Sequence, residues 1–404
     1  MKRIFVAFAL TVLSTVVFSQ EVSQWRGPDR TGIYRETGLM KQWPSAGPKL
    51  LWQYTGLGGG YSSAAVTSTD IFITGMVDGN GVLYALDHNG KLKWKKEYGR
   101  EWTSSHEGVR TTPLVIGNRL YLFSSYGQLI CMNTANGQII WSVDTFREYG
   151  GRNIQWGVTE NLLYDGNVLY CSPGGPDANI IAVDRNTGKL IWKSRGGDEK
   201  SAYGSPVLIN HGGKKILVAM MEKTIQAYDA ASGLFLWKHD HINQYSVHPN
   251  PPFYSNGMLY CNSGYGKGGI MLKLSADGKS VTRLWEDPNL DPKIGGFVVL
   301  NGKIYGGGDR NRSLFCLDWN SGKVTYSLRD LAPCNIISND GLLYIYAESG
   351  RVALVSPDAG KFNIISTFKV PLGEGPHWAH LVIHNKRLYV RHGSSLMVYD
   401  IAAR

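Results

Sequence analysis

The stretch "IIAVDRNTGKLIW", Ile180 to Trp192, decides the fold that the sequence predicts. Two apolar runs flank a polar turn that begins at Asp184. Gly188 supplies a positive φ and Asn186 tolerates a left-handed backbone, which is typical of a hairpin turn. A phosphate-binding loop would need a strand-to-helix transition and more glycines at fixed spacing, and neither is present. We expect Asp184 to hold the turn backbone and Trp192 to pack between neighbouring sheets.

The same pattern recurs along the chain and ends each time in an aromatic residue. Copies include "LYALDHNGKLKW", "LICMNTANGQIIW" and "IQAYDAASGLFLW". The closing aromatics are Trp52, Trp94, Trp141, Trp192, Trp237, Trp285, Tyr326 and Phe368. Their spacing of 41 to 51 residues is typical of propeller blades. Each full unit contains four strand-like runs, so the sequence predicts an all-β, eight-bladed propeller of four-stranded antiparallel blades.

The two ends of the chain are predicted to close the ring together. "SSLMVYD" (394–400) has no closing strand after it, and "PKLLWQY" (48–54) has no strands before it. Pairing these two segments in one blade removes the exposed sheet edges of an open ring. The predicted domains are a signal peptide at 1–19, an N-terminal arm at 20–47 that lies along one face, and the propeller at 48–404.

The first residues resemble a secretory signal peptide. Lys2 and Arg3 precede an almost wholly apolar run at 4–18, and small residues suit cleavage after Ser19. An uncleaved membrane anchor is the alternative, although the run is short for a span. No later run is apolar enough to cross a bilayer. We therefore expect an exported protein, periplasmic or secreted, that does not span the membrane.

Charge and cysteine content narrow the classes of partner. The formal net charge is +10, and the leader supplies two of these charges, so the remainder carries 10 − 2 = +8. This excess favours anionic partners, but no Lys/Arg run of the kind that binds nucleic acid occurs. The five cysteines form no Cys-x-x-Cys pair, which argues against zinc knuckles and c-type haem attachment.

The repeat resembles the pyrroloquinoline-quinone (PQQ) type of propeller, whose pattern is A-x-D-x-x-T-G-x-x-x-W. The opening stretch matches it at Ala182, Asp184, Thr187, Gly188 and Trp192. "WRGPDRTG" (25–32) and "SPGGPDA" (172–178) are similar to a secreted bacterial branch of this group. The resemblance implies the quinoprotein alcohol dehydrogenase-like fold, shared with the outer-membrane assembly propeller. It implies little about activity, because one fold hosts many functions.

A ligand site is expected at one mouth of the central channel. Loops that enter the innermost strands meet there with loops between the second and third strands. They carry cations, histidines and aromatic rings that suit carboxylate or sulfate groups and sugar or quinone rings. The candidate ligand-binding residues are Arg110, Trp156, Tyr203, His248, Tyr265, Lys293, Arg310, Arg312, His377, Trp378 and His380. Arg310 and Arg312 are two apart and are expected on the same side of an extended loop.

Three functions fit these residues. The first is a monomeric binding module for an anionic or carbohydrate ligand, or for a periplasmic protein partner. The second, implied by the resemblance, is a PQQ- and Ca²⁺-dependent alcohol dehydrogenase of the polyvinyl-alcohol type, with Glu160, Asn161 and Asp309 as possible oxygen donors. Against it, the adjacent Cys-Cys pair of many such enzymes is absent and the chain is shorter.

The third function is a polysaccharide lyase or glycosidase, with a His or Tyr base and an Arg that neutralises a uronate. No diagnostic spacing supports it, so no catalytic residue is assigned. No metal site is predicted, and no cofactor beyond the possible PQQ and Ca²⁺.

Overall fold

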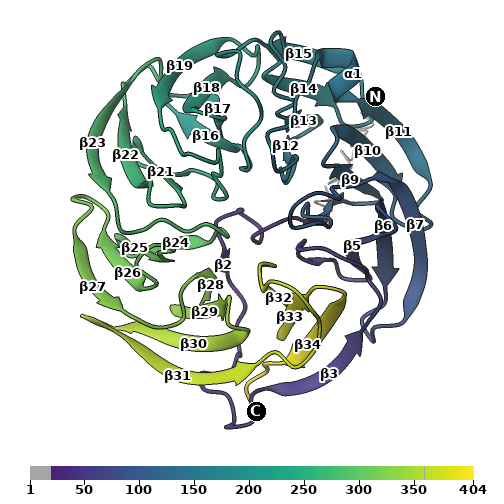
Figure 1. Cartoon of the computed structure of the whole chain (residues 1–404), viewed down its shortest axis with the longest axis vertical. Helices are drawn as coiled ribbons and strands as arrows, with labels where there is room; N and C mark the ends of the chain where they lie inside the picture. Colours follow the sequence, from purple (N-terminus) through teal and green to yellow (C-terminus); the bar gives the residue numbers. More distant parts are fainter. Residues whose placement is uncertain (1–19, 359) are drawn as a thin grey trace, which may run out of the picture.

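The computed structural model describes residues 20–358 and 360–404, and the predicted signal peptide at 1–19 lies outside them. Eight antiparallel blades, each built on four strands, form a closed ring around a central channel (Figure 1). One short helix, α1 (Thr145–Tyr149), is the only α-helix among the described residues. The predicted all-β, eight-bladed propeller of four-stranded blades is therefore confirmed.

Seven blades follow one another along the chain, each running from its innermost to its outermost strand. The first three of these blades contain β4 (Ala65–Val66), β5 (Ile71–Val77), β6 (Asn80–Leu86) and β7 (Leu92–Arg100); β8 (Leu114–Ile116), β9 (Arg119–Phe123), β10 (Gln128–Asn133) and β11 (Ile139–Asp144); and β12 (Leu163–Asp165), β13 (Val168–Cys171), β14 (Ile180–Asp184) and β15 (Leu190–Ser194). The next two contain β16 (Val207–His211), β17 (Lys214–Met220), β18 (Thr224–Asp229) and β19 (Phe235–Asp240); and β20 (Phe253–Ser255), β21 (Met258–Ser263), β22 (Gly268–Leu274) and β23 (Val281–Asp287). The last two contain β24 (Phe297–Leu300), β25 (Lys303–Gly307), β26 (Leu314–Asp318) and β27 (Val324–Leu328); and β28 (Cys334–Asn339), β29 (Leu342–Ala347), β30 (Arg351–Asp358) and β31 (Lys361–Lys369).

The eighth blade joins the two ends of the chain. It contains β32 (Val382–His384), β33 (Arg387–His392) and β34 (Ser395–Asp400), and its outermost strand is β3 (Lys49–Tyr54). β3 pairs antiparallel with β34, with Lys49 opposite Asp400 and Tyr54 opposite Leu396. The predicted closure by the two terminal segments is confirmed, and it leaves no blade with an unpaired inner strand.

The repeated Asp fixes the turn of each repeat, and the repeated Gly and Trp form the contact between neighbouring blades. Asp184 Oδ1 accepts hydrogen bonds from the backbone N–H groups of Asn186 and Thr187 at 3.0 and 2.9 Å, which fixes the turn. Gly188 has φ +73°, and a Cβ there would lie 2.7 Å from the Trp141 ring of the preceding blade. Glycine is therefore required both for the backbone conformation and for the close approach of the ring.

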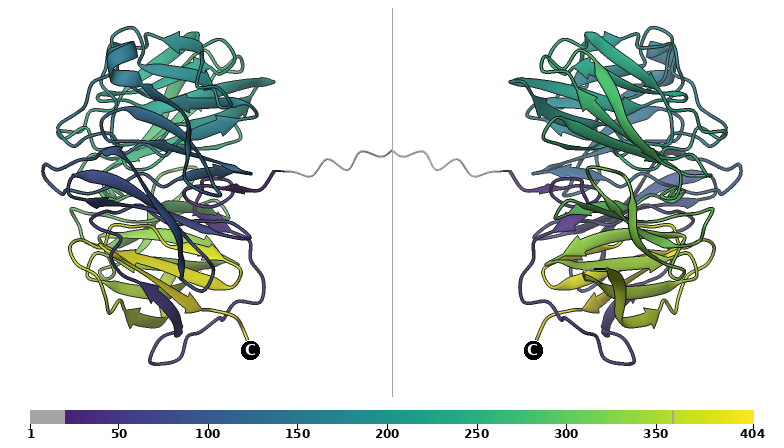
Figure 2. Two further views of the ribbon diagram at one scale, coloured as in Figure 1. Left: turned by 90° about the vertical axis from the view of Figure 1, so that its right-hand side faces the viewer. Right: turned by 90° about the vertical axis from the view of Figure 1, so that its left-hand side faces the viewer.

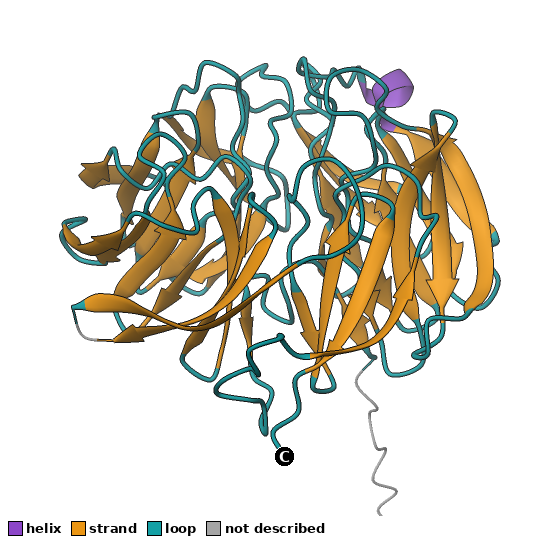
Figure 3. Ribbon diagram, turned by 60° about the horizontal axis from the view of Figure 1, so that its bottom comes forward, coloured by secondary structure: helices purple, strands orange, loops and turns teal. Residues whose placement is uncertain are grey.

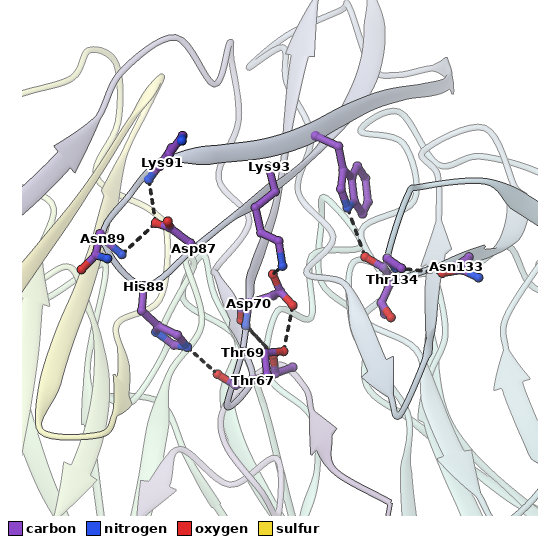
Figure 4. Close-up of polar contacts among 12 residues, drawn as sticks. Thr67, Thr69, Asp70, Asp87, His88, Asn89, Lys91, Lys93, Asn133 and Thr134 are labelled. Atoms are coloured by element: carbon purple, nitrogen blue, oxygen red, sulfur yellow. Dashed lines mark hydrogen bonds and ion pairs between the residues drawn. The ribbon is translucent and has the colours of Figure 1, made fainter.

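The tryptophans also donate hydrogen bonds to the next blade. The Trp192 indole donates to the Ala230 carbonyl at 3.1 Å, and the Trp94 indole to the Thr134 carbonyl at 3.2 Å. Figure 4 shows the equivalent turn of the first blade, where Asp87 accepts from the backbone N–H groups of Asn89 and Lys91. The prediction that Trp192 packs between blades is confirmed, and the same contact recurs around the ring.

Aliphatic and aromatic side chains of adjacent blades fill the space between them. One such cluster combines Tyr170 and Ile180 with Leu217 and Tyr228 from the following blade. The five cysteines are unpaired and buried. Among the described residues, no helix has the length and apolar character needed to cross a membrane.

The N-terminal arm adds a strand to each of two blades. Its strand β1 (Val22–Ser23) adds to β8, and β2 (Ile33–Tyr34) pairs in parallel with β28. Between them the chain crosses the centre of the ring (Figure 1), and it reaches the ring from the same side as the C-terminus (Figure 2). Many of the longer loops gather at the opposite face (Figure 3). The arm therefore lies across one end of the channel, opposite the loop-rich face.

Candidate functional site

A cavity of about 370 Å³ lies at the loop-rich mouth of the channel, and we call it the mouth pocket. Its walls come from loops that precede the innermost strands and from loops between the second and third strands. Its aromatic residues are Trp25, Tyr61, Trp156, Tyr203, Tyr265 and Trp378. The other titratable residues in its wall are His106, Arg110, Lys293, Glu348 and His380.

Seven of the eleven candidate residues line the mouth pocket, and four do not. The seven are Arg110, Trp156, Tyr203, Tyr265, Lys293, Trp378 and His380. Arg310 lines a second cavity that shares Trp156 and Tyr265 with the first. Arg312 lines neither of these cavities, and its φ of +48° breaks the extended backbone that would place it on the same side as Arg310.

His248 and His377 also lie outside the mouth pocket. His248 is fully buried, and its Nδ1 lies 2.5 Å from Ser263 Oγ. Burial lowers the pKa of His248 to about 4, so the ring is neutral. The Tyr346 hydroxyl lies 2.6 Å from Nδ1 of His377, and the His377 ring stacks on His392 at 3.6 Å. Both histidines contact neighbouring loops and line neither of these two cavities.

Arg110 is the cation of the mouth pocket that has no acidic partner. Its guanidinium donates to the backbone carbonyls of Trp156, Ser105 and His106. The guanidinium carbon also lies 5.7 Å from the centre of the Tyr203 ring. No carboxylate within residues 20–358 or 360–404 forms an ion pair with it. These contacts fix the direction of the side chain, and among the described residues no direct ion pair offsets its charge.

Lys293, unlike Arg110, has two acidic partners. Its ammonium lies 3.0 Å from the Asp309 carboxylate and 3.5 Å from that of Glu348. The Trp378 indole donates to the other Glu348 oxygen at 2.9 Å, and the Trp378 ring lies 5.0 Å from that of Tyr61. This network orients Trp378 in the wall and offsets the charge of Lys293.

The floor of the mouth pocket joins the N-terminal arm to His380. The Trp25 ring meets the His380 ring edge-to-face at 5.1 Å. His380 Nδ1 lies 3.4 Å from the Arg26 guanidinium, which can only donate, so Nδ1 accepts and the imidazole is neutral. Burial, with a smaller contribution from the Arg26 charge, lowers the pKa of His380 to about 3.

Two buried arginines anchor the arm, and sequence reasoning missed their role. Arg26 donates to the carbonyls of Phe297 and Ile336, and Arg30 donates to those of Leu162 at 2.6 Å and Pro206 at 3.4 Å. The four acceptors belong to four different blades. The signal that could have indicated this role is the pair of arginines in "WRGPDRTG", within a turn rich in glycine and proline.

The oxygen donors considered for Ca²⁺ do not fit such an ion. A Glu160 oxygen accepts from the Ser172 backbone N–H at 3.0 Å, and burial raises the pKa of Glu160 to about 8. Asn161 Oδ1 accepts from the Thr112 N–H at 2.7 Å, and Asp309 pairs with the Lys293 ammonium. Among the described residues, no group of three or more His, Cys, Asp or Glu side chains is arranged to hold a metal.

Comparison with known proteins agrees with the fold. The sequence profile of a family described as outer membrane protein assembly factor BamB matches residues 41–175 and 176–402. The BamB of Kangiella koreensis is 27% identical over 47% of this chain and 45% of its own length. The quinoprotein alcohol dehydrogenase PedH of Pseudomonas putida is 28% identical over 36% of this chain and 24% of its own. The chain thus spans less than half of the length of these curated relatives.

Two solved structures resemble the ring at low identity. The BamB of Moraxella catarrhalis superposes with a TM-score of 0.62 at 13% identity, over 88% of this chain and 98% of that one. The quinohemoprotein alcohol dehydrogenase of Comamonas testosteroni gives 0.64 at 11% identity, over 93% and 79%. At such identities the likeness concerns the fold alone.

Proposed function

Because the chain belongs to the PQQ-like propeller family described as outer membrane protein assembly factor BamB, we propose a binding role within that fold. The protein is an exported, monomeric ligand-binding propeller whose mouth pocket holds an anionic carbohydrate. The observation that carries this proposal is the Arg110 guanidinium, which has no ion pair among the described residues, in a pocket walled by aromatic rings. The positive guanidinium attracts carboxylate groups, and aromatic faces stack on sugar rings.

The charges of the other wall residues leave Arg110 as the main attraction for an anion. Lys293 is offset by Asp309 and Glu348, and His380 is neutral at physiological pH because its pKa is about 3. A hydrogen bond to a charged group contributes about 1.5–3 kcal/mol. Loss of Arg110 should therefore weaken the binding of a uronate by roughly 10- to 150-fold.

Calorimetric titration with galacturonate and with neutral galactose tests this function. We expect galacturonate to bind more tightly, the difference to shrink as salt rises, and Arg110→Ala to abolish the preference. Arg312→Ala is the matched control, because it removes an exposed arginine that lines neither cavity. Equal binding of the two sugars, or no effect of Arg110→Ala, would refute the proposal.

The enzymatic alternatives have their own readouts on the same preparation. Asn161 and Asp309 already hold other partners, and the described residues form no cluster of three or more His, Cys, Asp or Glu side chains arranged for a metal, so we expect no dye-linked alcohol oxidation after addition of PQQ and Ca²⁺. Alcohol oxidation that a chelator abolishes would favour the PQQ-dependent dehydrogenase over the binding role. Shortened products from oligogalacturonate would favour the lyase or glycosidase.

A protein partner is the second candidate, because the family description names an assembly factor. Cross-linking in the native host, with and without Arg110→Ala, tests whether such a partner uses the same mouth. Export is tested by N-terminal sequencing of the native protein, which should begin near Gln20; an intact Met1 on cytoplasmic protein would contradict it.

A further inference from the structure

A second cavity of about 440 Å³ adjoins the mouth pocket, and we call it the rim hollow. It is lined by Trp156, Gln244, Tyr245, Tyr265, Asp309 and Arg310. Trp156 and Tyr265 also line the mouth pocket, so these two side chains form a wall common to both cavities. A ligand longer than one ring unit can therefore leave the mouth pocket over this wall and enter the rim hollow.

The aromatic side chains of the rim hollow are held in place although two of them are exposed. The exposed fractions of Tyr245 and Tyr265 are 37% and 39%, and their ring centres lie 4.7 Å apart. The Trp156 indole donates to the Tyr245 carbonyl at 3.0 Å, which links two loops across the rim. Exposed rings with fixed orientation offer stacking surface at little cost in conformational entropy.

One buried carboxylate positions both sides of the rim hollow. Asp291 is fully buried, and it accepts from the backbone N–H of Gly266 at 2.7 Å and from that of Asp309 at 2.8 Å. It also accepts from the Arg310 N–H at 3.2 Å. Tyr265, next to Gly266, has φ +57°, a conformation that bulky residues rarely adopt and that clusters at ligand sites. The Tyr265 turn and the Arg310 loop are thus fixed relative to each other.

The rim hollow carries one positive charge that the protein does not offset. Asp309 is paired with Lys293, whereas the exposed Arg310 guanidinium makes no ion pair with any described residue. The rim hollow therefore repeats the chemistry of the mouth pocket, in which an unpaired guanidinium lies beside aromatic rings.

We propose that the rim hollow is a second subsite for an acidic oligosaccharide, which rests on the proposed function of the mouth pocket. One uronate ring lies in the mouth pocket with its carboxylate on Arg110. A following ring stacks against Tyr245 and Tyr265 with its carboxylate on Arg310. The protein thus selects uronate chains over single uronate units.

Titration with galacturonate and with its linear dimer and trimer tests this subsite. We expect the trimer to bind about tenfold more tightly than the monomer. Arg310→Ala should remove this gain without changing monomer binding, and Tyr245→Ala should reduce the gain even at high salt, because stacking is not screened. Arg312→Ala, two residues away on the same loop, should keep the full gain. Thermal melting verifies that each variant is folded.

The possible failures are distinguishable. Monomer binding that depends on Arg110 but shows no gain with length, or an equal loss in the Arg310 and Arg312 variants, would overturn the second subsite alone. Failure of every acidic sugar to bind would refute the proposed function and the subsite with it.

Discussion

Replacement of Gly188 by alanine tests how the repeat joins its blades. The left-handed backbone at φ +73° costs an L-residue about 1–2 kcal/mol. The added Cβ would also lie 2.7 Å from Trp141 Cε3, and the Trp141 indole is held by its hydrogen bond to the Arg185 carbonyl at 3.1 Å. Overpacking of this kind costs about 1–3 kcal/mol. We expect Gly188→Ala to lower the free energy of unfolding by about 2–5 kcal/mol.

Gly166→Ala in the same blade separates the two contributions. Gly166 has φ +55°, but no atom lies within 4 Å of its added Cβ, so only the backbone cost of about 1–2 kcal/mol applies. Urea unfolding followed by tryptophan fluorescence compares the variants. Gly188→Ala should also cost less in a Trp141→Leu background, where the clashing ring is gone. Equal destabilisation by the two glycine substitutions would refute the role assigned to the tryptophan contact.

Two further predictions concern the closed ring and its buried histidines. Deletion of residues 394–404 removes β34 and exposes the edges of β3 and β33, so the protein should aggregate on size-exclusion chromatography; a variant that melts like the full chain would contradict closure. The pKa of buried His248 is about 4 in the folded protein, against about 6.5 in the unfolded chain. Because the unfolded chain then binds the proton more tightly, the free energy of unfolding keeps its full value above pH 6.5 and falls by up to about 1.4 kcal/mol per pH unit between pH 6.5 and pH 4. Melting from pH 7 to pH 5 should show a smaller fall for His248→Asn, and an unchanged fall would exclude this cause.

The ring was predictable because its determinants are local and repeated. Asp184, Gly188 and Trp192 each satisfy a short-range requirement, and the same requirements recur at a regular period. The pairing of β3 with β34 followed because a closed ring admits no other partner for two incomplete units. The repeat therefore contains most of the information that specifies the fold.

The candidate site was only partly predictable, because its residues depend on contacts between blades. Loop position alone did not distinguish Trp378, which faces the mouth pocket, from His377, which turns to Tyr346 and His392. The alternation argument for Arg310 and Arg312 assumed an extended backbone, and the left-handed Arg312 breaks it. Trp25 belongs to no repeat, so no periodic pattern could place it in the floor of the mouth pocket.

The buried arginines of the arm have a consequence for the order in which the protein folds. Their acceptors, the carbonyls of Leu162, Pro206, Phe297 and Ile336, are separated by up to 174 residues, since 336 − 162 = 174. These four carbonyls converge only after the blades that carry them have assembled. The arm, which precedes these blades in the sequence, therefore docks after they have assembled.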